Sequence, residues 1–283
     1  MGSRFKVGDL AEAKRAGRPI VMATGYDYVS ARAIDAAGVD IVLVGDSAAT
    51  TVLGLPVTRE VTLDEMLMLT RAVRRGITNA MLVGDLPFGT YESSDEQAVA
   101  TARVYADIGC DAVKMEGAGE IASRVRAVVD SGMPVMAHVG LRPQRLTAGE
   151  AARVEGRSAD DAMRLLDDAH ALEDAGCCSM VVEAVPASVM ALLAPLIDVP
   201  TIGIGAGWST DGQVLVTTDL LGLTDGHVPK FVKSYADLRV QMIGAFERFA
   251  EDVRARRFPD EAHSYGVPAR EVEALQQRLA QRA

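Results

Sequence analysis

Six ionisable side chains lie inside or directly after short apolar segments of this sequence, where a soluble protein seldom leaves a charge without a function. They are Asp46, Asp85, Lys114, Glu116, His138 and Glu183. Buried ions cost several kcal/mol each unless they are paired or bound to a metal. Four carboxylates with a single lysine and a single histidine therefore predict a further cation where these segments meet.

The donor types indicate which cation this would be. Carboxylate oxygens with one histidine and no cysteine suit a hard, partly hydrated ion such as Mg2+ better than Zn2+. Asp46 and Asp85 are the expected direct ligands, because short side chains from neighbouring strands can hold one ion and leave positions open for a substrate. An aspartate after a strand is by itself more often a turn or a helix cap. Glu116 and Glu183, however, lie within apolar segments, where a glutamate caps nothing.

The segments that carry these residues alternate with helical stretches along the chain. Each is a short, β-branched apolar run followed by a loop rich in Gly, Asp or Pro, which is typical of parallel strands buried on both faces. Ser94 and Ser158 carry the cap chemistry of helix starts between such runs. The runs cover residues 19–24, 40–45, 79–84, 111–116, 134–139, 179–185, 200–205 and, more weakly, 213–221.

Eight βα units in about 250 residues indicate an α/β fold, the TIM (β/α)8 barrel, in which catalytic groups stand at the carboxyl ends of the strands. A doubly wound sheet also alternates strands and helices, but its phosphate-binding fingerprint is missing. The glycine-rich segment 203–207 is followed by Trp208 where a third glycine belongs, and it lies on the seventh run. We expect one domain over residues 1–283, with an N-terminal helix, the barrel at about 19–222 and C-terminal helices at about 235–282.

Composition and charge exclude other classes of protein. The 283 residues include 29 Lys and Arg against 39 Asp and Glu, and the net charge of −10 disfavours binding to nucleic-acid phosphates. An apolar content of 49% is typical of a globular protein, and no apolar run reaches the ~18 residues that a membrane span needs. The three cysteines, Cys110, Cys177 and Cys178, fit a reducing compartment. We therefore expect a cytoplasmic protein with no nucleic-acid or membrane partner.

Several short motifs follow one another along the chain. They are GDS at 45–47, DLPFG at 85–89, VKMEG at 113–117, HVGLRPQ at 138–144, IGIGAG at 202–207 with DGQ at 211–213, and PKFVK at 229–233. This series resembles the ketopantoate hydroxymethyltransferase (3-methyl-2-oxobutanoate hydroxymethyltransferase) family. The match runs in register from about Tyr26 to Tyr265, and so many blocks in one order are not expected by chance.

The resemblance implies a barrel of the phosphoenolpyruvate/pyruvate superfamily type. It implies transfer of a one-carbon unit from 5,10-methylenetetrahydrofolate to a 2-oxo acid, most simply 3-methyl-2-oxobutanoate, with Mg2+ as cofactor. By position, Asp46 and Asp85 would bind the ion that the substrate chelates, with Glu116 near it through water. Ser47 and Lys114 would hold the substrate carboxylate. The family also implies a homo-oligomer of ten subunits.

Two further residues would carry the proton transfer in such an enzyme. By resemblance, Glu183 is the base that removes the proton from C3, and His138 contacts the substrate oxygens or the product hydroxyl. A C–H beside a ketone is a far weaker acid than a carboxylic acid. A glutamate can therefore remove this proton only if the enolate is strongly stabilised, which a chelated Mg2+ would do.

The sequence departs from the family pattern in three places. The loop 145–156 reads EAARVEG at 150–156, where the family has a GGYKVQG block. AAT replaces LGM at 48–50, and Trp208 replaces a proline. The residues expected to take part in the chemistry match the family, whereas residues expected to shape the site differ. This pattern fits the same reaction with a different 2-oxo acid or a different one-carbon donor.

Two other interpretations stay open at this stage. One is the same enolate chemistry on a different 2-oxo acid, or with a free aldehyde in place of folate, in a specialised biosynthetic pathway. The other is a catalytically silent homologue kept as a binding or scaffold protein. The second is disfavoured because a silent protein has no reason to keep six charged residues in apolar segments.

Overall fold

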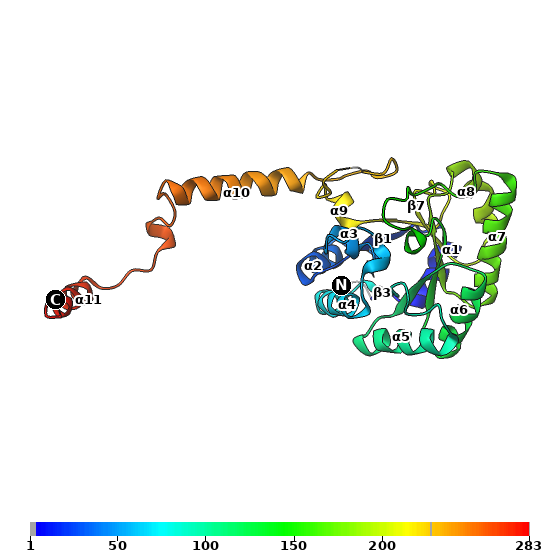
Figure 1. Cartoon of the computed structure of the whole chain (residues 1–283), viewed down its shortest axis with the longest axis horizontal. Coiled ribbons are helices and arrows are strands. Elements are labelled where there is room, and N and C mark those ends of the chain that lie inside the picture. The colour runs from blue at the N-terminus through cyan, green and yellow to red at the C-terminus, as the bar shows by residue number, and fades with distance from the viewer. Residues whose placement is uncertain (1–3, 227, 283) are drawn as a thin grey trace. The chain divides into compact units, whose positions relative to one another are not determined.

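Eight parallel strands form a closed barrel in the computed structural model of the protein, which describes residues 4–226 and 228–282 (Figure 1). The strands pair in chain order, and β8 pairs with β1 to close the ring. They are β1 (Ile20–Thr24), β2 (Ile41–Val44), β3 (Met81–Asp85), β4 (Ala112–Glu116), β5 (Val135–Gly140), β6 (Ser179–Glu183), β7 (Thr201–Ile204) and β8 (Gly212–Leu215). This topology confirms the predicted TIM (β/α)8 barrel.

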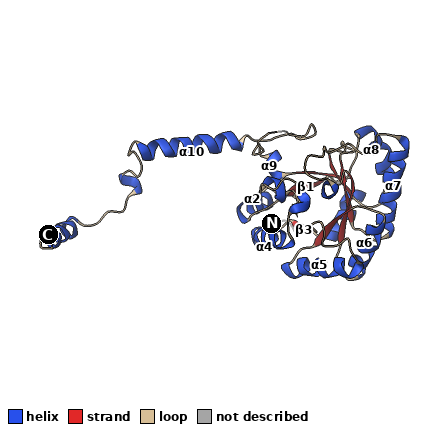
Figure 2. Cartoon of the chain, viewed as in Figure 1, coloured by secondary structure: helices blue, strands red, loops and turns tan. Residues whose placement is uncertain are grey.

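Helices of the same part of the chain surround these strands, blue around red in Figure 2. The predicted caps are present: the Ser94 hydroxyl accepts the N–H of Gln97 at 3.2 Å, and the Ser158 hydroxyl accepts that of Asp161 at 3.1 Å. The helices are α1 (Val7–Arg15), α2 (Tyr28–Ala36), α3 (Ala48–Thr51), α4 (Leu63–Gly76), α5 (Asp95–Ile108), α6 (Glu120–Asp130), α7 (Ala159–Asp174), α8 (Ala187–Leu193), α9 (Thr217–Leu220), α10 (Leu238–Arg254) and α11 (Ala269–Ala280).

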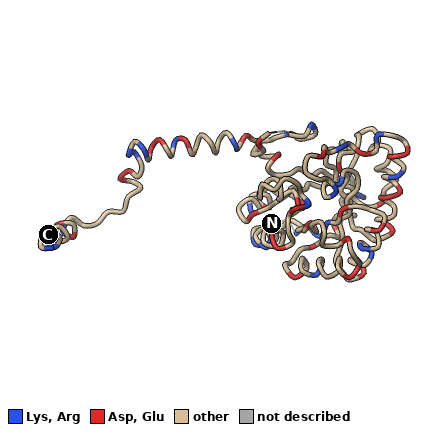
Figure 3. Tube along the Cα trace, in the orientation of Figure 1, with Lys and Arg blue, Asp and Glu red and all other residues tan. Residues whose placement is uncertain are grey.

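The chain divides into two compact units, Met1–Tyr235 and Ala236–Ala283. The first contains the barrel with α1 to α9, and the second contains α10 and α11, the helices expected at about 235–282. One domain over residues 1–283 therefore stays a prediction. Acidic and basic residues are interspersed along both units (Figure 3). Of the helices in the described ranges, none has the length and apolar character needed to cross a membrane.

The eighth strand is shorter than predicted. We expected it over 213–221, but β8 ends at Leu215 and the chain then turns into α9. Thr217 causes this turn, because its N–H donates to the Thr24 hydroxyl at 2.8 Å and its own hydroxyl donates to the Thr24 carbonyl. The prediction was wrong because a short apolar run does not distinguish one longer strand from a strand followed by a helical turn.

Side chains alternate along each strand between the helices and the barrel interior. In β4, Val113 and Met115 pack in the apolar layer against the helices, whereas Ala112 lies in the interior cluster. Lys114 and Glu116 share the face of Ala112, so the alternation directs both charges into the barrel. The interior is thus apolar at the amino ends of the strands and polar at their carboxyl ends.

Helix α1 closes the apolar end of the barrel. Leu10 and Ala13 are buried in the interior cluster with strand residues such as Met81 and Val181. Lys14 fastens the helix in place, since its Nζ lies 3.0 Å from an Asp211 carboxylate oxygen and donates to two backbone carbonyls at 2.9 and 3.1 Å.

Truncation of the closing helix should destabilise the barrel. We expect Leu10→Ala to lower the free energy of unfolding by about 2–5 kcal/mol, because a fully buried leucine leaves a cavity when shortened to alanine. Glu12→Ala, at an exposed position of the same helix, is the control and should change stability little. Urea unfolding measures both, and equal stabilities would show that α1 does not seal the interior.

Candidate active site

All seven residues expected at the site line one cavity of about 100 Å3 at the carboxyl ends of the strands. They come from five strands or from the loops directly after them, so the barrel brings together positions far apart in the sequence. These residues are Asp46, Ser47, Asp85, Lys114, Glu116, His138 and Glu183.

A buried ion pair joins β3 and β4 at the centre of this cavity. Lys114 pairs in register with Asp85, and its Nζ donates to both carboxylate oxygens at 2.8 Å. The second carboxylate is close, since the N–H of Asp46 donates to Asp85 Oδ2 at 3.1 Å. Burial raises the pKa of Asp85, against the effect of Lys114, and the charge of Asp46 adds to the rise. Burial alone would lower the pKa of Lys114, but the two aspartates outweigh it, so the ammonium stays charged.

His138 lies between two glutamates. Its Nδ1 is 3.5 Å from Glu116 Oε2, and its Nε2 is 3.3 Å from Glu183 Oε2. Burial and Lys114 lower the pKa of His138, but the two carboxylates outweigh them and raise it to about 9. Neither ring nitrogen forms a hydrogen bond, and Glu116 Oε2 is also buried without one.

The backbone at Gly140 sets the position of Glu183. Gly140 pairs with Glu183 across β5 and β6, and its φ of +90° lies in the region that favours glycine. A Cβ at this position would collide with the Glu183 carbonyl oxygen.

Glu183 is the most accessible charged residue of the site, with 18% of its side chain exposed against 2% for His138. A small ligand in the cavity could therefore reach this carboxylate.

Gln144, named above only as the last residue of a motif, is buried and links several residues of the site by hydrogen bonds. Its side-chain amide donates to Asp46 Oδ2 and to the Leu86 carbonyl, both at 3.0 Å. Its side-chain oxygen accepts the Tyr91 hydroxyl at 2.6 Å, and its backbone N–H donates to Glu116 Oε1 at 3.1 Å. The signal for this role was a glutamine at the end of the HVGLRPQ motif, directly after β5.

The donor set fits a hard divalent cation. Four carboxylates face Lys114 and His138, so even a protonated histidine leaves negative charge in excess. Glu116 Oε2, which accepts no hydrogen bond, and the adjacent aspartates offer only oxygen ligands. Within the described ranges, no three Asp, Glu, His or Cys side chains enclose an ion by themselves. An ion here would complete its shell with water or substrate oxygens, as Mg2+ commonly does.

A closed (β/α)8 barrel with ionisable groups at the carboxyl ends of its strands defines a class of enzyme. Among solved structures, 2,3-dimethylmalate lyase, a member of the PEP mutase/isocitrate lyase superfamily, has the same fold with a TM-score of 0.58. The two sequences are 17% identical, and the match covers 91% of each chain. This comparison therefore supports the expected barrel fold.

The sequence comparisons are more specific. A family model described as ketopantoate hydroxymethyltransferase matches residues 4–261. A 3-methyl-2-oxobutanoate hydroxymethyltransferase of Acidothermus cellulolyticus is 51% identical over 93% of this chain and 97% of its own. One of Oleidesulfovibrio alaskensis is 48% identical over 96% and 94%. This chain belongs to the ketopantoate hydroxymethyltransferase family, which confirms the expected family and the expectation of an enzyme.

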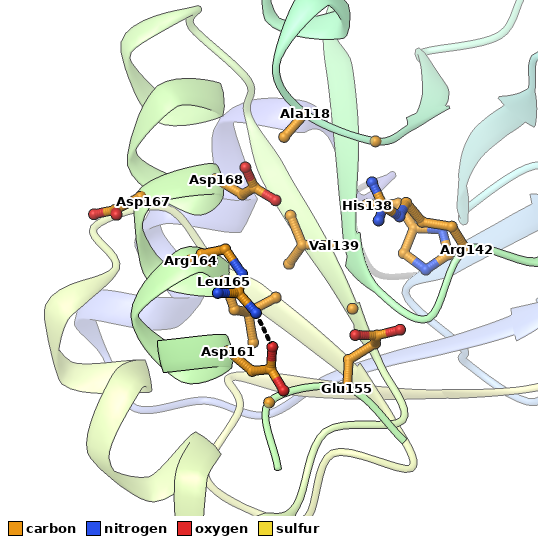
Figure 4. Close-up of a pocket in the computed structure, with 13 residues that line it drawn as sticks. Ala118, His138, Val139, Arg142, Glu155, Asp161, Arg164, Leu165, Asp167 and Asp168 are labelled. Atoms are coloured by element: carbon orange, nitrogen blue, oxygen red, sulfur yellow. Dashed lines mark hydrogen bonds and ion pairs between the residues drawn. The ribbon is translucent and has the colours of Figure 1, made fainter. Parts of the chain in front are cut away.

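None of the three places where the sequence departs from the family pattern lines the site cavity. Ala48 and Ala49 are the buried residues of α3, and Trp208 is 87% exposed. The loop 145–156 instead contributes Glu155 and Gly156 to a second cavity, beside His138 (Figure 4).

Removal of the Gln144 amide should loosen the aspartate site. We expect Gln144→Met to weaken Mg2+ binding by about 10–100-fold, because Asp46 loses the donor that orients it. Unpaired buried groups should also cost about 1–3 kcal/mol of stability. Tyr91→Phe keeps the bond to Asp46 and should affect Mg2+ binding less. Calorimetric titration with Mg2+ measures the affinities, and equal values for Gln144→Met and the parent protein would contradict this role.

Proposed function

We propose that this protein transfers a hydroxymethyl group from 5,10-methylenetetrahydrofolate to C3 of 3-methyl-2-oxobutanoate, giving 2-dehydropantoate, with Mg2+ as cofactor. One observation carries the proposal. The seven residues to which the family resemblance assigns roles line a single cavity, in a chain whose curated relatives carry the name of this activity.

The cation would be held by the two aspartates. Asp46 and Asp85 would bind it directly, with Glu116 near it through water, and Gln144 would keep Asp46 oriented. When bound, Mg2+ supplies stabilisation for the negative charge that develops on the keto oxygen of the substrate.

Two residues would hold the substrate carboxylate. Lys114 is charged and buried, and it stands beside the proposed ion ligands, so it can balance a second anion that enters the cavity. Ser47 lines the same cavity, and its hydroxyl is held by the Tyr26 hydroxyl at 2.8 Å. Together they would orient the 2-oxo acid with C3 toward β6.

Glu183 would act as the base. Its carboxylate is partly accessible and can take the C3 proton, after which C3 bonds to the one-carbon unit. The methylene carbon leaves the two nitrogens of the carrier and takes its oxygen from water, so one water is consumed. The C3–H bond is replaced by the new C–C bond. The O–H of this water becomes the new hydroxyl, and its other proton and the C3 proton go to the two carrier nitrogens. His138, next to Glu183, would contact the substrate oxygens or this hydroxyl.

The structure also bears on the alternative acceptors. Since no divergent residue lines the site cavity, its walls give no reason to expect a different 2-oxo acid. A reaction with a free aldehyde would use the same enolate chemistry without folate. A requirement for tetrahydrofolate therefore separates the two functions.

The enolising half-reaction can be tested by proton NMR in D2O with Mg2+ and 3-methyl-2-oxobutanoate. We expect the C3–H signal to disappear, and a chelator to stop its loss. Glu183→Gln should bind the acid but lose exchange, because the amide cannot accept the proton. Asp85→Ala should lose the Mg2+-dependent exchange while the barrel stays folded. Undiminished exchange in Glu183→Gln would reassign the base to His138, and undiminished exchange in Asp85→Ala would remove that residue from the metal site.

We further propose a homo-oligomer in the cytoplasm. Within the second unit, α10 has no buried residue and exposes an apolar stripe at helical spacing. The stripe consists of Met242, Phe246, Phe249 and Val253, which a second copy of the chain would cover. The unpaired state of all three cysteines fits a reducing compartment.

A charge in this stripe should weaken the assembly. We expect Phe246→Asp to lower the molar mass measured by light scattering, because a buried unpaired carboxylate opposes association. Glu247→Ala, at the next exposed position of α10, is the matched control and should leave the mass unchanged. The same mass for Phe246→Asp and the parent protein would show that α10 does not form the interface.

A further inference from the structure

A second cavity of about 240 Å3 lies beside the site, between the carboxyl ends of β4 and β5 and the helix α7 (Figure 4). Ala118, Val139 and Leu165 contribute apolar walls. His138 lines both this cavity and the site cavity, so the two share a wall at the residue next to the proposed base. We call the second cavity the α7 cavity.

The charged residues around the α7 cavity are four carboxylates, two arginines and His138. Arg164 pairs with Asp161, and Asp167 points away from the cavity (Figure 4). Asp168 and Glu155 are therefore the carboxylates that can accept N–H donors of a ligand, and Arg142 is the arginine that can donate to one.

Asp168 is the side chain best placed to receive such donors. It points into the cavity from α7, whereas its neighbour Asp167 points away (Figure 4). Asp168 is half-buried and forms no hydrogen bond or ion pair with the described residues. Burial raises the pKa of its carboxyl, although Arg142 opposes the rise. A half-buried carboxylate of this kind is costly without a partner, so a ligand that supplies paired donors would remove the cost.

We propose that the α7 cavity binds the amino-pyrimidinone edge of the pterin ring of the one-carbon carrier, with Asp168 accepting its paired N–H groups. Arg142, the arginine without a carboxylate partner in the described chain, would donate to the adjacent ring carbonyl. This inference rests on the proposed function, which makes a reduced folate the donor.

Size and position agree with a ring in this place. Pockets for whole drug-sized ligands span about 300–1,000 Å3, so a cavity of 240 Å3 suits a bicyclic ring. The anionic tail of the carrier would then lie outside the cavity. A ring held here adjoins His138, and through it the cavity in which the 2-oxo acid would be enolised.

The loop 145–156, which departs from the family pattern, would contact the carrier in this cavity. Glu155 and Gly156, from the loop 145–156, line the α7 cavity and not the site cavity. This one of the three departures from the family pattern therefore concerns the walls of the proposed carrier cavity, while the residues expected around the acid are kept.

The test measures tetrahydrofolate binding by calorimetry in the full-length protein. We expect Asp168→Asn to weaken binding by about tenfold or more, since a charge-assisted pair is replaced by an amide whose NH2 faces ring donors. Ala118→Phe should weaken it similarly by filling the cavity. Asp167→Asn, one position away on α7, is the matched control and should bind as the parent protein does.

The exchange of C3–H in 3-methyl-2-oxobutanoate, which needs no carrier, separates this inference from the proposed function. Weakened tetrahydrofolate binding in Asp168→Asn and Ala118→Phe supports the inference, whether or not the parent protein enolises this acid. Unchanged binding in both variants overturns it and places the carrier elsewhere. Exchange without any tetrahydrofolate binding in the parent protein overturns it as well, together with the folate part of the proposed function.

Discussion

The buried ion pair between Lys114 and Asp85 is the interaction on which the rest of the site depends. Both side chains are almost fully removed from water, and the lysine contacts both oxygens of its partner at 2.8 Å. Such a pair is stable only if its remaining charge is also balanced. Asp46, Glu116 and Glu183 add negative charge around it, so the cavity is unfavourable for further anions but favourable for a cation that could then hold an anionic substrate. The excess negative charge, which costs stability when no cation is bound, thus makes the cavity selective for a cation.

The barrel tolerates this arrangement because its interior is divided into two layers. Near α1 the interior is a closed apolar cluster around Leu10 and Met81, which can stabilise the fold without any contribution from the polar end. The same alternation along each strand that fills this cluster also directs Lys114 and His138 inward one step further along. The inward faces of the strands therefore carry the apolar core at their amino ends and the polar site at their carboxyl ends. Residues of the polar layer can be altered without exposing the apolar layer.

Much of this could be predicted because it depends on local periodicity. Seven of the eight strands and the position of every charged residue at a strand end follow from apolar runs and their punctuation. The end of β8 could not be predicted, because it is decided by hydrogen bonds between Thr217 and Thr24, which are far apart in the sequence. Gln144 was missed for the same reason: its partners Asp46 and Tyr91 lie on other segments, and only the closed barrel brings them together. The α7 cavity likewise has no signature in the sequence, since its walls come from two strand ends, a loop and a helix.

The presence of two separate cavities explains how the charged residues of the site can match the family while a loop near them differs from it. The residues that we propose to bind the acid and move its proton stand on strands or directly after them, where a substitution can disturb a neighbouring strand, as the contact of Gly140 with Glu183 illustrates. The α7 cavity is bordered in part by the loop 145–156, which lies outside the strands and contacts the end of β6, since the Glu155 N–H donates to the Ala184 carbonyl at 2.9 Å. Because Glu155 and Gly156 line the α7 cavity and not the site cavity, variation in this loop should affect the proposed carrier cavity more directly than the site of the acid. The retained charges and the altered loop are then consistent with the proposed reaction, with a differently shaped cavity for the one-carbon carrier.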